Sequence, residues 1–78
     1  MIFAITGNVH IFASRKEIQK KIESLGGKVA GSVSKKTAYL INNDVESSSS
    51  KNKDAKKNDV PIITEEEFLK LLNKRNKG

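Results

Sequence analysis

The chain of 78 residues contains no cysteine, one histidine, and 15 lysine and arginine residues against nine acidic ones. A domain of this size lies near the lower limit for a core stabilised by packing alone, and without cysteine neither a disulfide nor a thiolate metal site can support it. Because a lone histidine cannot make a metal cluster, we expect no metal and no other cofactor. The net charge of +6 favours an acidic partner such as nucleic acid, although a lysine-rich surface can also serve solubility alone.

The chain begins with an apolar run at residues 2–5, which Thr6 and Gly7 follow directly. Continuous apolar sequence predicts a central strand that is buried on both faces. Ligands of open parallel sheets collect at the carboxyl ends of strands, so a phosphate could bind at Thr6 and Gly7. In the alternative interpretation Thr6 only caps the strand and Gly7 only turns the chain, and the residues alone leave both open.

Ser14 and Glu17 have the spacing of a capping box and predict the start of a helix. Its apolar stripe has spacings of four and three residues and consists of Ile18, Ile22 and Leu25. The double glycine at residues 26–27 ends this helix, and we expect Gly27 to take the left-handed conformation that turns the chain into the next strand.

Residues 28–30 and 38–41 predict two strands, and the polar link between them holds no helix. Residues 42–50 include two asparagines and four consecutive serines, which predict a solvated surface loop. Residues 51–57 predict a short helix around Ala55, which Asn58 and Asp59 end early.

Residues 60–63 predict a last strand, in which Pro61 suits an edge position because it lacks one ladder donor. Thr64 and Glu67 form a second capping box, with the carboxylates of residues 65–67 at the positive end of a helix dipole. The inward-facing residues of this helix are expected to be Phe68, Leu71 and Leu72. We expect one domain over residues 1–75 and a frayed tail at 76–78.

This order of elements predicts an α/β fold, with a four-stranded parallel sheet flanked by three helices. Right-handed crossovers place the first and last helices on one face of the sheet and the lysine-rich helix alone on the other.

Three segments of the chain carry a family resemblance: Thr6-Gly7, the stretch from Leu25 to Leu40 with its double glycine, and residues 61–68. In these segments the chain resembles the BRCT domain, most of all the BRCT domains of bacterial NAD-dependent DNA ligases and of the large subunit of replication factor C. Phe68 stands where many BRCT domains carry a tryptophan, and phenylalanine is usual there in this subgroup. The resemblance implies strands at 28–30 and 38–41 on either side of the first strand.

The resemblance also implies a phosphate pocket. In BRCT domains that bind phosphate, a hydroxyl and a glycine amide of the first loop hold it, with a lysine at the start of the second helix and, in this subgroup, a nearby arginine. The matching positions are Thr6, Gly7, Arg15 and Lys51. A second lysine is usual three places after Lys51, but this chain has Asp54 there and Lys53 just before it. Either Lys53 substitutes for it or the pocket is weakened.

Lys35 and Lys36 precede the strand at 38–41 and could contact a DNA backbone, or they could belong to an ordinary solvated loop. The sequence has no base-reading helix and no row of aromatic stacking residues, so recognition of DNA should be independent of sequence.

Catalysis finds little support, because a second histidine, a cysteine and a phosphate loop of the GxxxxGK type are all missing. We therefore expect a non-catalytic BRCT module of a replication or repair protein, which binds DNA ends or nicks by a 5′-phosphate. The alternative is a protein-interaction module, including one that binds a phosphopeptide. The start has no leader and no apolar stretch reaches a membrane span, so we expect no membrane partner and a cytoplasmic location for a bacterial ligase, or a nuclear one for a eukaryotic protein.

Overall fold

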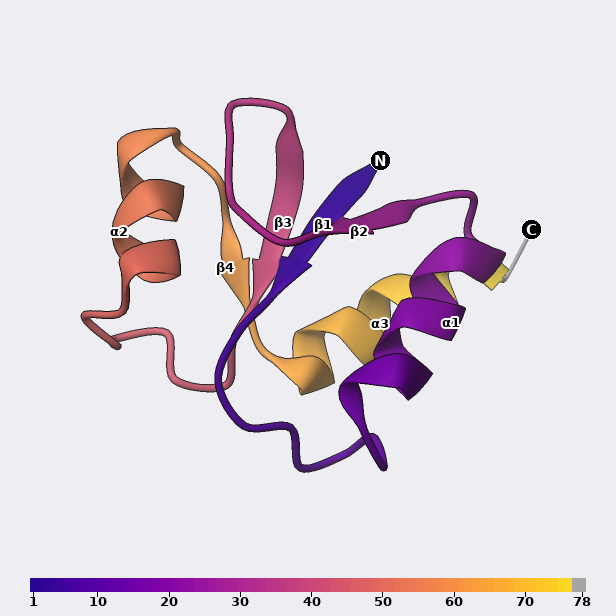
Figure 1. The fold of residues 1–78 in the computed structure, drawn as a ribbon. Coiled ribbons are helices and arrows are strands. Elements are labelled where there is room, and N and C mark those ends of the chain that lie inside the picture. Colours follow the sequence, from indigo (N-terminus) through magenta and orange to yellow (C-terminus); the bar gives the residue numbers. More distant parts are fainter. Residues whose placement is uncertain (77–78) are drawn as a thin grey trace.

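The computed structural model describes residues 1–76, with side chains for residues 1–74 (Figure 1). Its elements follow the predicted order: β1 (Ile2–Ile5), α1 (Arg15–Ser24), β2 (Lys28–Ala30), β3 (Thr37–Ile41), α2 (Ser50–Lys57), β4 (Ile62–Ile63) and α3 (Glu65–Asn76). Helix α3 includes Asn76, while residues 77 and 78 of the expected tail lie outside the described part of the chain. No helix in the described part is long and apolar enough to cross a membrane.

The strands form one parallel sheet in the order β2-β1-β3-β4, which confirms the predicted fold class and the central position of β1. Strand β4 lies at the edge, as Pro61 indicated, and the carbonyl of Pro61 accepts the Leu40 N–H at 2.9 Å. The predicted strand at 60–63 was too long at its start. Val60 instead donates its N–H to the Ala55 carbonyl at 2.7 Å and thereby closes the end of α2.

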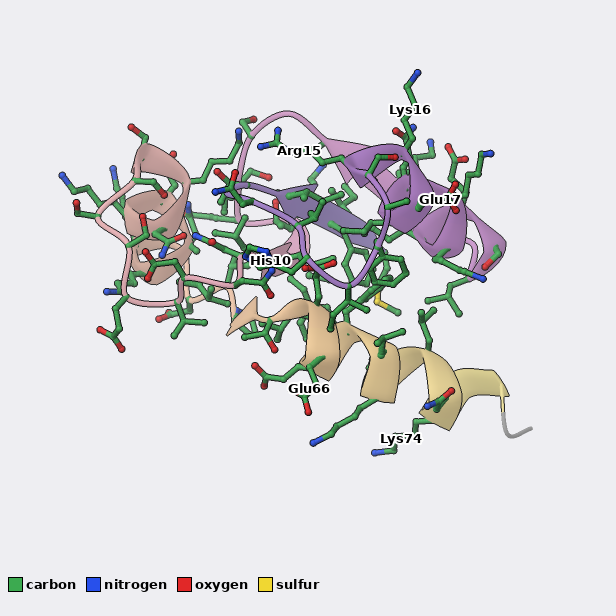
Figure 2. The ribbon with its side chains drawn as sticks, turned by 90° about the horizontal axis from the view of Figure 1, so that it is seen from below. His10, Arg15, Lys16, Glu17, Glu66 and Lys74 are labelled. Atoms are coloured by element: carbon green, nitrogen blue, oxygen red, sulfur yellow. The ribbon has the colours of Figure 1, made fainter. Side chains whose placement is uncertain are left out.

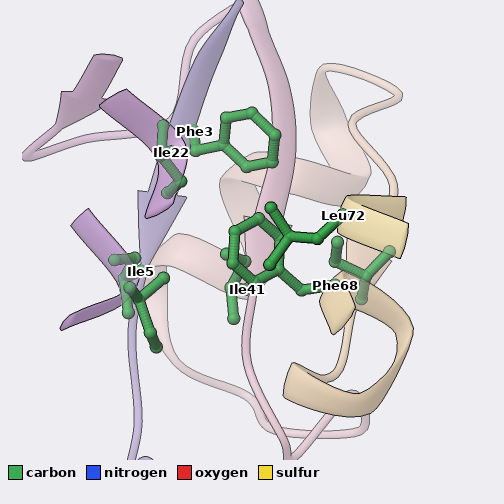
Figure 3. Close-up of a cluster of buried hydrophobic side chains, with 8 residues drawn as sticks. Phe3, Ile5, Ile22, Ile41, Phe68 and Leu72 are labelled. Atoms are coloured by element: carbon green, nitrogen blue, oxygen red, sulfur yellow. The ribbon is translucent and has the colours of Figure 1, made fainter. Parts of the chain in front are cut away.

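Helices α1 and α3 cover one face of the sheet and α2 covers the other, as predicted (Figure 1). Alternation along β1 divides the core, because Phe3 and Ile5 face α1 and α3 while Ala4 faces α2. The larger cluster consists of Phe3, Ile5, Ile18, Ile22, Ile41, Ile63, Phe68 and Leu72 (Figure 3). At its centre the Phe3 ring meets the Phe68 ring edge-on at 5.7 Å. The smaller cluster consists of Ala4, Val33, Leu40, Ala55 and Val60.

The ends of the helices differ from the predicted caps in two places. Thr64 and Glu67 form the full capping box, with both reciprocal hydrogen bonds at 3.1 Å. Ser14 occupies the N-cap of α1, but its side chain makes no capping hydrogen bond within the described residues. The Glu17 N–H donates to the Ser14 carbonyl instead, at 3.1 Å. Helix α2 has a cap that was not predicted, since the Ser49 hydroxyl accepts the Asn52 N–H.

In the turn after α1 the left-handed residue is not Gly27, as predicted, but its neighbour. Gly26, with φ of +82°, takes this conformation, and Gly27 does not. Gly27 is nevertheless confined, because it is buried beneath the helix end and the first residue of the chain. A Cβ atom at Gly27 would lie 2.9 Å from the Ile22 Cγ2 and 3.1 Å from the Met1 carbonyl oxygen. The double glycine therefore combines a positive φ at one position with close packing at the next.

Replacing Gly27 by valine should lower the free energy of unfolding by roughly 1–3 kcal/mol, the usual cost of forcing extra atoms into a packed site. The matched control is Gly31→Ala, because a Cβ at Gly31 meets no atom of the described residues within 4 Å. Urea denaturation of both variants measures the difference. A Gly27→Val chain as stable as the Gly31→Ala chain would contradict the packing described for this turn.

Candidate phosphate-binding site

Thr6 and Gly7 leave the sheet at the carboxyl end of its central strand. The Thr6 N–H still pairs with the Ile41 carbonyl at 3.0 Å, so the ladder continues one residue beyond β1. Gly7 then turns the chain with φ of +78°, and a Cβ there would lie 2.6 Å from the Oδ1 of Asn42. Position 7 thus requires glycine for its backbone conformation and for the close approach of Asn42.

Two cations from opposite faces of the sheet meet beside this turn. Arg15, the first residue of α1, donates from Nη2 to the Gly7 carbonyl at 2.9 Å. Lys51, in the first turn of α2, lines the same cavity of about 280 Å³ as Arg15. The other lining residues are Ile5, Gln19, Val29, Ala30 and Gly31. This cavity is therefore lined by one arginine and one lysine, the residue types that bind anions in proteins.

Thr6 and Gly7 line a neighbouring cavity of about 290 Å³ and not the cavity of the two cations. The rest of its lining is polar: Asn8, His10, Asn42, Asn43, Asp44, Ser47 and Ser49. This cavity lies between the carboxyl ends of β1 and β3, where ligands of open α/β sheets bind. The matched residues therefore lie together at one edge but in two adjoining cavities, which the bond from Arg15 to Gly7 connects.

Lys53 and Asp54 are both exposed on α2. Residues three apart are neighbours on a helix, so Asp54 lies beside Lys51, while Lys53 points to a different side. Lys35 and Lys36 form an exposed turn before β3, at the opposite edge of the sheet from Thr6. The five residues of β3 separate them from the pocket by roughly 15 Å. These two lysines therefore belong to a different surface.

The loop at 42–50 is not simply solvated, as the serine and asparagine content had indicated. Asn42 and, in the next helix, Asn52 are 3% and 0% exposed, and the Asn42 Nδ2 donates to the Asn52 Oδ1 at 2.8 Å. The Asn52 Nδ2 in turn donates to the carbonyls of Asp44 and Val45. The only sequence signal was a pair of asparagines directly after a buried strand, and turn propensity explains such a pair equally well.

Glu65 has a role that its position at the start of α3 did not indicate. Its side chain is fully buried and accepts hydrogen bonds from the backbone N–H groups of residues 10–12 and from the side chain of Asn43. It thereby fixes the loop after Gly7 to the start of α3. Figure 2 shows the contrast, with His10 beside the start of this helix and Glu66 pointing away from the molecule.

Burial by itself would raise the pKa of Glu65, but the hydrogen bonds from Phe12, His10, Asn43 and Ile11 favour the carboxylate and leave the pKa below its usual value. The folded state therefore releases this proton more readily than the unfolded state does. The resulting stabilisation is complete above the ordinary pKa and is lost as the pH falls through the lowered one.

A four-stranded parallel sheet with two helices on one face and one on the other defines a small α/β domain. Residues 1–72 match the family model of the BRCA1 C Terminus (BRCT) domain, and the chain belongs to this family. The resemblance to the ligase subgroup is also confirmed, because similar proteins are named DNA ligase.

The DNA ligase of Lachnoclostridium phytofermentans is 59% identical over 73 residues, which is 94% of this chain and 11% of that protein. The DNA ligase of Ruminiclostridium cellulolyticum is 56% identical over 71 residues, with 91% and 11% covered. The DNA ligase of Mycoplasmopsis synoviae is 50% identical over 74 residues, with 95% and 10% covered. The chain spans about a tenth of the length of these relatives.

Glu65→Gln should lower the free energy of unfolding at neutral pH by roughly 1.5–3 kcal/mol, because it removes the charge that accepts the loop amides. It should also flatten the loss of stability that the wild-type chain shows as the pH falls below about 4.5, the ordinary pKa of glutamate. Thermal unfolding from neutral to acid pH measures both effects. The matched control is Glu66→Gln at the exposed neighbouring position, and an equal effect of the two variants would contradict the role given to Glu65.

Proposed function

We propose that this BRCT domain is a non-catalytic module of a bacterial NAD-dependent DNA ligase and that it binds DNA ends or nicks through their 5′-phosphate. The relatives named DNA ligase support the parent protein, and a bacterial ligase would act in the cytoplasm on the nucleoid. The observation that carries the binding proposal is the meeting of Arg15 and Lys51 beside the Thr6-Gly7 turn.

In this proposal the phosphate lies at the turn, between the two adjoining cavities. Arg15 is already oriented by its bond to the Gly7 carbonyl, and the remaining N–H groups of its guanidinium are suited to phosphate oxygens. Lys51 supplies the second positive charge, while the Thr6 hydroxyl and the Gly7 amide supply neutral donors. The negative charge of Asp54 beside Lys51 weakens the positive potential at the pocket. The pocket therefore attracts a phosphate less strongly than one with a lysine at position 54 would.

Exposed lysines outside the pocket provide further contacts to the DNA backbone. Val33 and Ala55 pack together, so the turn with Lys35 and Lys36 lies on the same side of the sheet as α2. The exposed lysines of α2 are Lys53, Lys56 and Lys57. Contacts of this kind carry no base information, so binding should be independent of DNA sequence. A phosphoserine peptide carries the same phosphate group without a duplex, so its affinity is compared with that of the phosphorylated duplex.

Thr6→Ala should abolish the preference for a 5′-phosphorylated duplex over an unphosphorylated one, because it removes a hydrogen bond to the terminal phosphate. A bond to a charged group is worth about 1.5–3 kcal/mol, so the loss is measurable. Lys57→Ala removes a charge at the far end of α2 and should weaken binding of both duplexes alike. Fluorescence anisotropy with matched duplexes measures the two affinities.

Asp54→Lys should raise the affinity for the phosphorylated end, because it replaces the acid beside Lys51 by a second cation. If Lys53→Ala is the damaging change and Asp54→Lys is neutral, Lys53 serves the pocket instead. If Thr6 and both positions on α2 leave the phosphate preference unchanged and the phosphoserine peptide binds more tightly, the domain is a protein-interaction module.

The logarithm of the duplex affinity should fall linearly with the logarithm of salt concentration, with a slope of about −0.9 for each phosphate contact. Lys35→Ala combined with Lys36→Ala should make this slope shallower by roughly one per lysine. Lys20→Ala combined with Lys21→Ala removes the same charge from the exposed side of α1 and serves as the control. Equal slopes for the two double variants would show that the turn before β3 makes no specific contribution.

A further inference from the structure

Two buried asparagines connect the turn after β1 with the first turn of α2. Asn42 follows β3, and its Oδ1 occupies the space where residue 7 would carry a Cβ. Its Nδ2 donates to Asn52, which comes directly after Lys51. A continuous path of contacts therefore runs from Gly7 through Asn42 and Asn52 to Lys51, the second cation of the site.

Both side-chain amides of this pair have hydrogen-bond partners for their nitrogen and their oxygen. The Asn42 Oδ1 accepts the Asp44 N–H at 2.9 Å, and the Asn52 Nδ2 donates to the Asp44 and Val45 carbonyls at 3.2 and 3.3 Å. Among the described residues no buried side-chain nitrogen or oxygen lacks a hydrogen bond. Satisfied buried polar networks fix one arrangement of their elements, because any shift leaves a donor or acceptor unpaired.

An apolar contact would not fix this part of the molecule in the same way. The side of α2 that faces the sheet carries only Ala55 as a fully buried apolar side chain, and alanine has no shape that could set the position of the helix along the sheet. The hydrogen bonds of Asn52 are directional and lie one residue from Lys51. They are therefore suited to set the distance between the Lys51 ammonium and the Gly7 turn.

We propose that Asn42 and Asn52 are positioning residues of the phosphate site, which hold Lys51 at the separation from Gly7 that a phosphate group requires. This proposal rests on the proposed function. Asn42 lines the cavity of Thr6 and Gly7 and supports the turn, while Asn52 lines neither of the two cavities and fixes the start of α2. Their loss should lower the selectivity for a phosphorylated end more than it lowers duplex binding in general, because the surface lysines remain in place.

The test compares Asn52→Leu with Asn58→Leu. Asn58 lies at the other end of α2 and donates from Nδ2 to the Asp54 carbonyl at 2.9 Å, so the control also loses an asparagine hydrogen bond on the same helix. Asn52→Leu should lower the ratio of affinities for the 5′-phosphorylated and unphosphorylated duplexes by about tenfold, the effect of losing one bond to a charged group. Asn58→Leu should leave this ratio unchanged. Both are measured well below the melting temperature of each variant.

A second measurement needs no variant. In the wild-type chain the side-chain amide resonances of Asn42 and Asn52 should shift when the phosphorylated duplex is added and remain in place with the unphosphorylated one. A folded Asn52→Leu chain with the wild-type ratio of affinities for the two duplexes would overturn the proposal. If that variant does not fold, side-chain amide resonances of Asn42 and Asn52 that do not shift with the phosphorylated duplex would overturn it. Failure of the proposed function is recognised separately, because the wild-type chain then has no preference for the phosphorylated duplex.

Discussion

The fold depends on one constraint, which is that β1 must be buried on both faces and paired on both edges. Phe3 and Ile5 enter the larger core cluster and Ala4 enters the smaller one, while β2 and β3 take the two edges. A strand so enclosed can present only its ends to solvent. The residues that follow it, Thr6 and Gly7, therefore lie at the centre of the carboxyl edge, where loops from both faces of the sheet converge.

Polar side chains hold the loops at this edge in place, and two consecutive asparagines connect it to different helices. Asn42 connects the edge to α2 through Asn52, whereas Asn43 connects it to α3 through Glu65 and to the loop after Gly7 through the Asn8 carbonyl. The two bonded networks are directional and lie at the margin of the apolar clusters. They fix the loops more narrowly than hydrophobic packing could, since packing does not depend on direction.

The sequence predicted the order of elements from apolar periodicity and from residues such as Pro61 that restrict the backbone. The two covered faces followed from the right-handed crossover rule, and the strands beside β1 from the family resemblance. The prediction was wrong about Gly27, since adjacent glycines look alike in sequence and only the packing around Ile22 distinguishes them. It also missed the buried roles of Asn52 and Glu65. Both side chains form hydrogen bonds with partners that are distant in sequence, and a polar residue near a helix start is explained equally well by capping. The residues that match the family's phosphate pocket do lie at one edge of the sheet. Sequence spacing gave no indication that they line two different cavities.

The two helical layers differ in how much apolar side chain they bury, and this difference has a consequence for motion. The α1–α3 layer contains two buried phenylalanines, whereas the α2 layer is held by alanine, valine and leucine side chains. Layers with less buried apolar surface open at a lower free energy, so we expect the amide hydrogens of α2 to exchange with solvent before those of α1 and α3. A ligand that contacts Lys51 would be bound partly by the layer that opens first. Such a ligand would slow exchange in α2 by stabilising its closed form, and the domain would become more uniformly rigid when the site is filled.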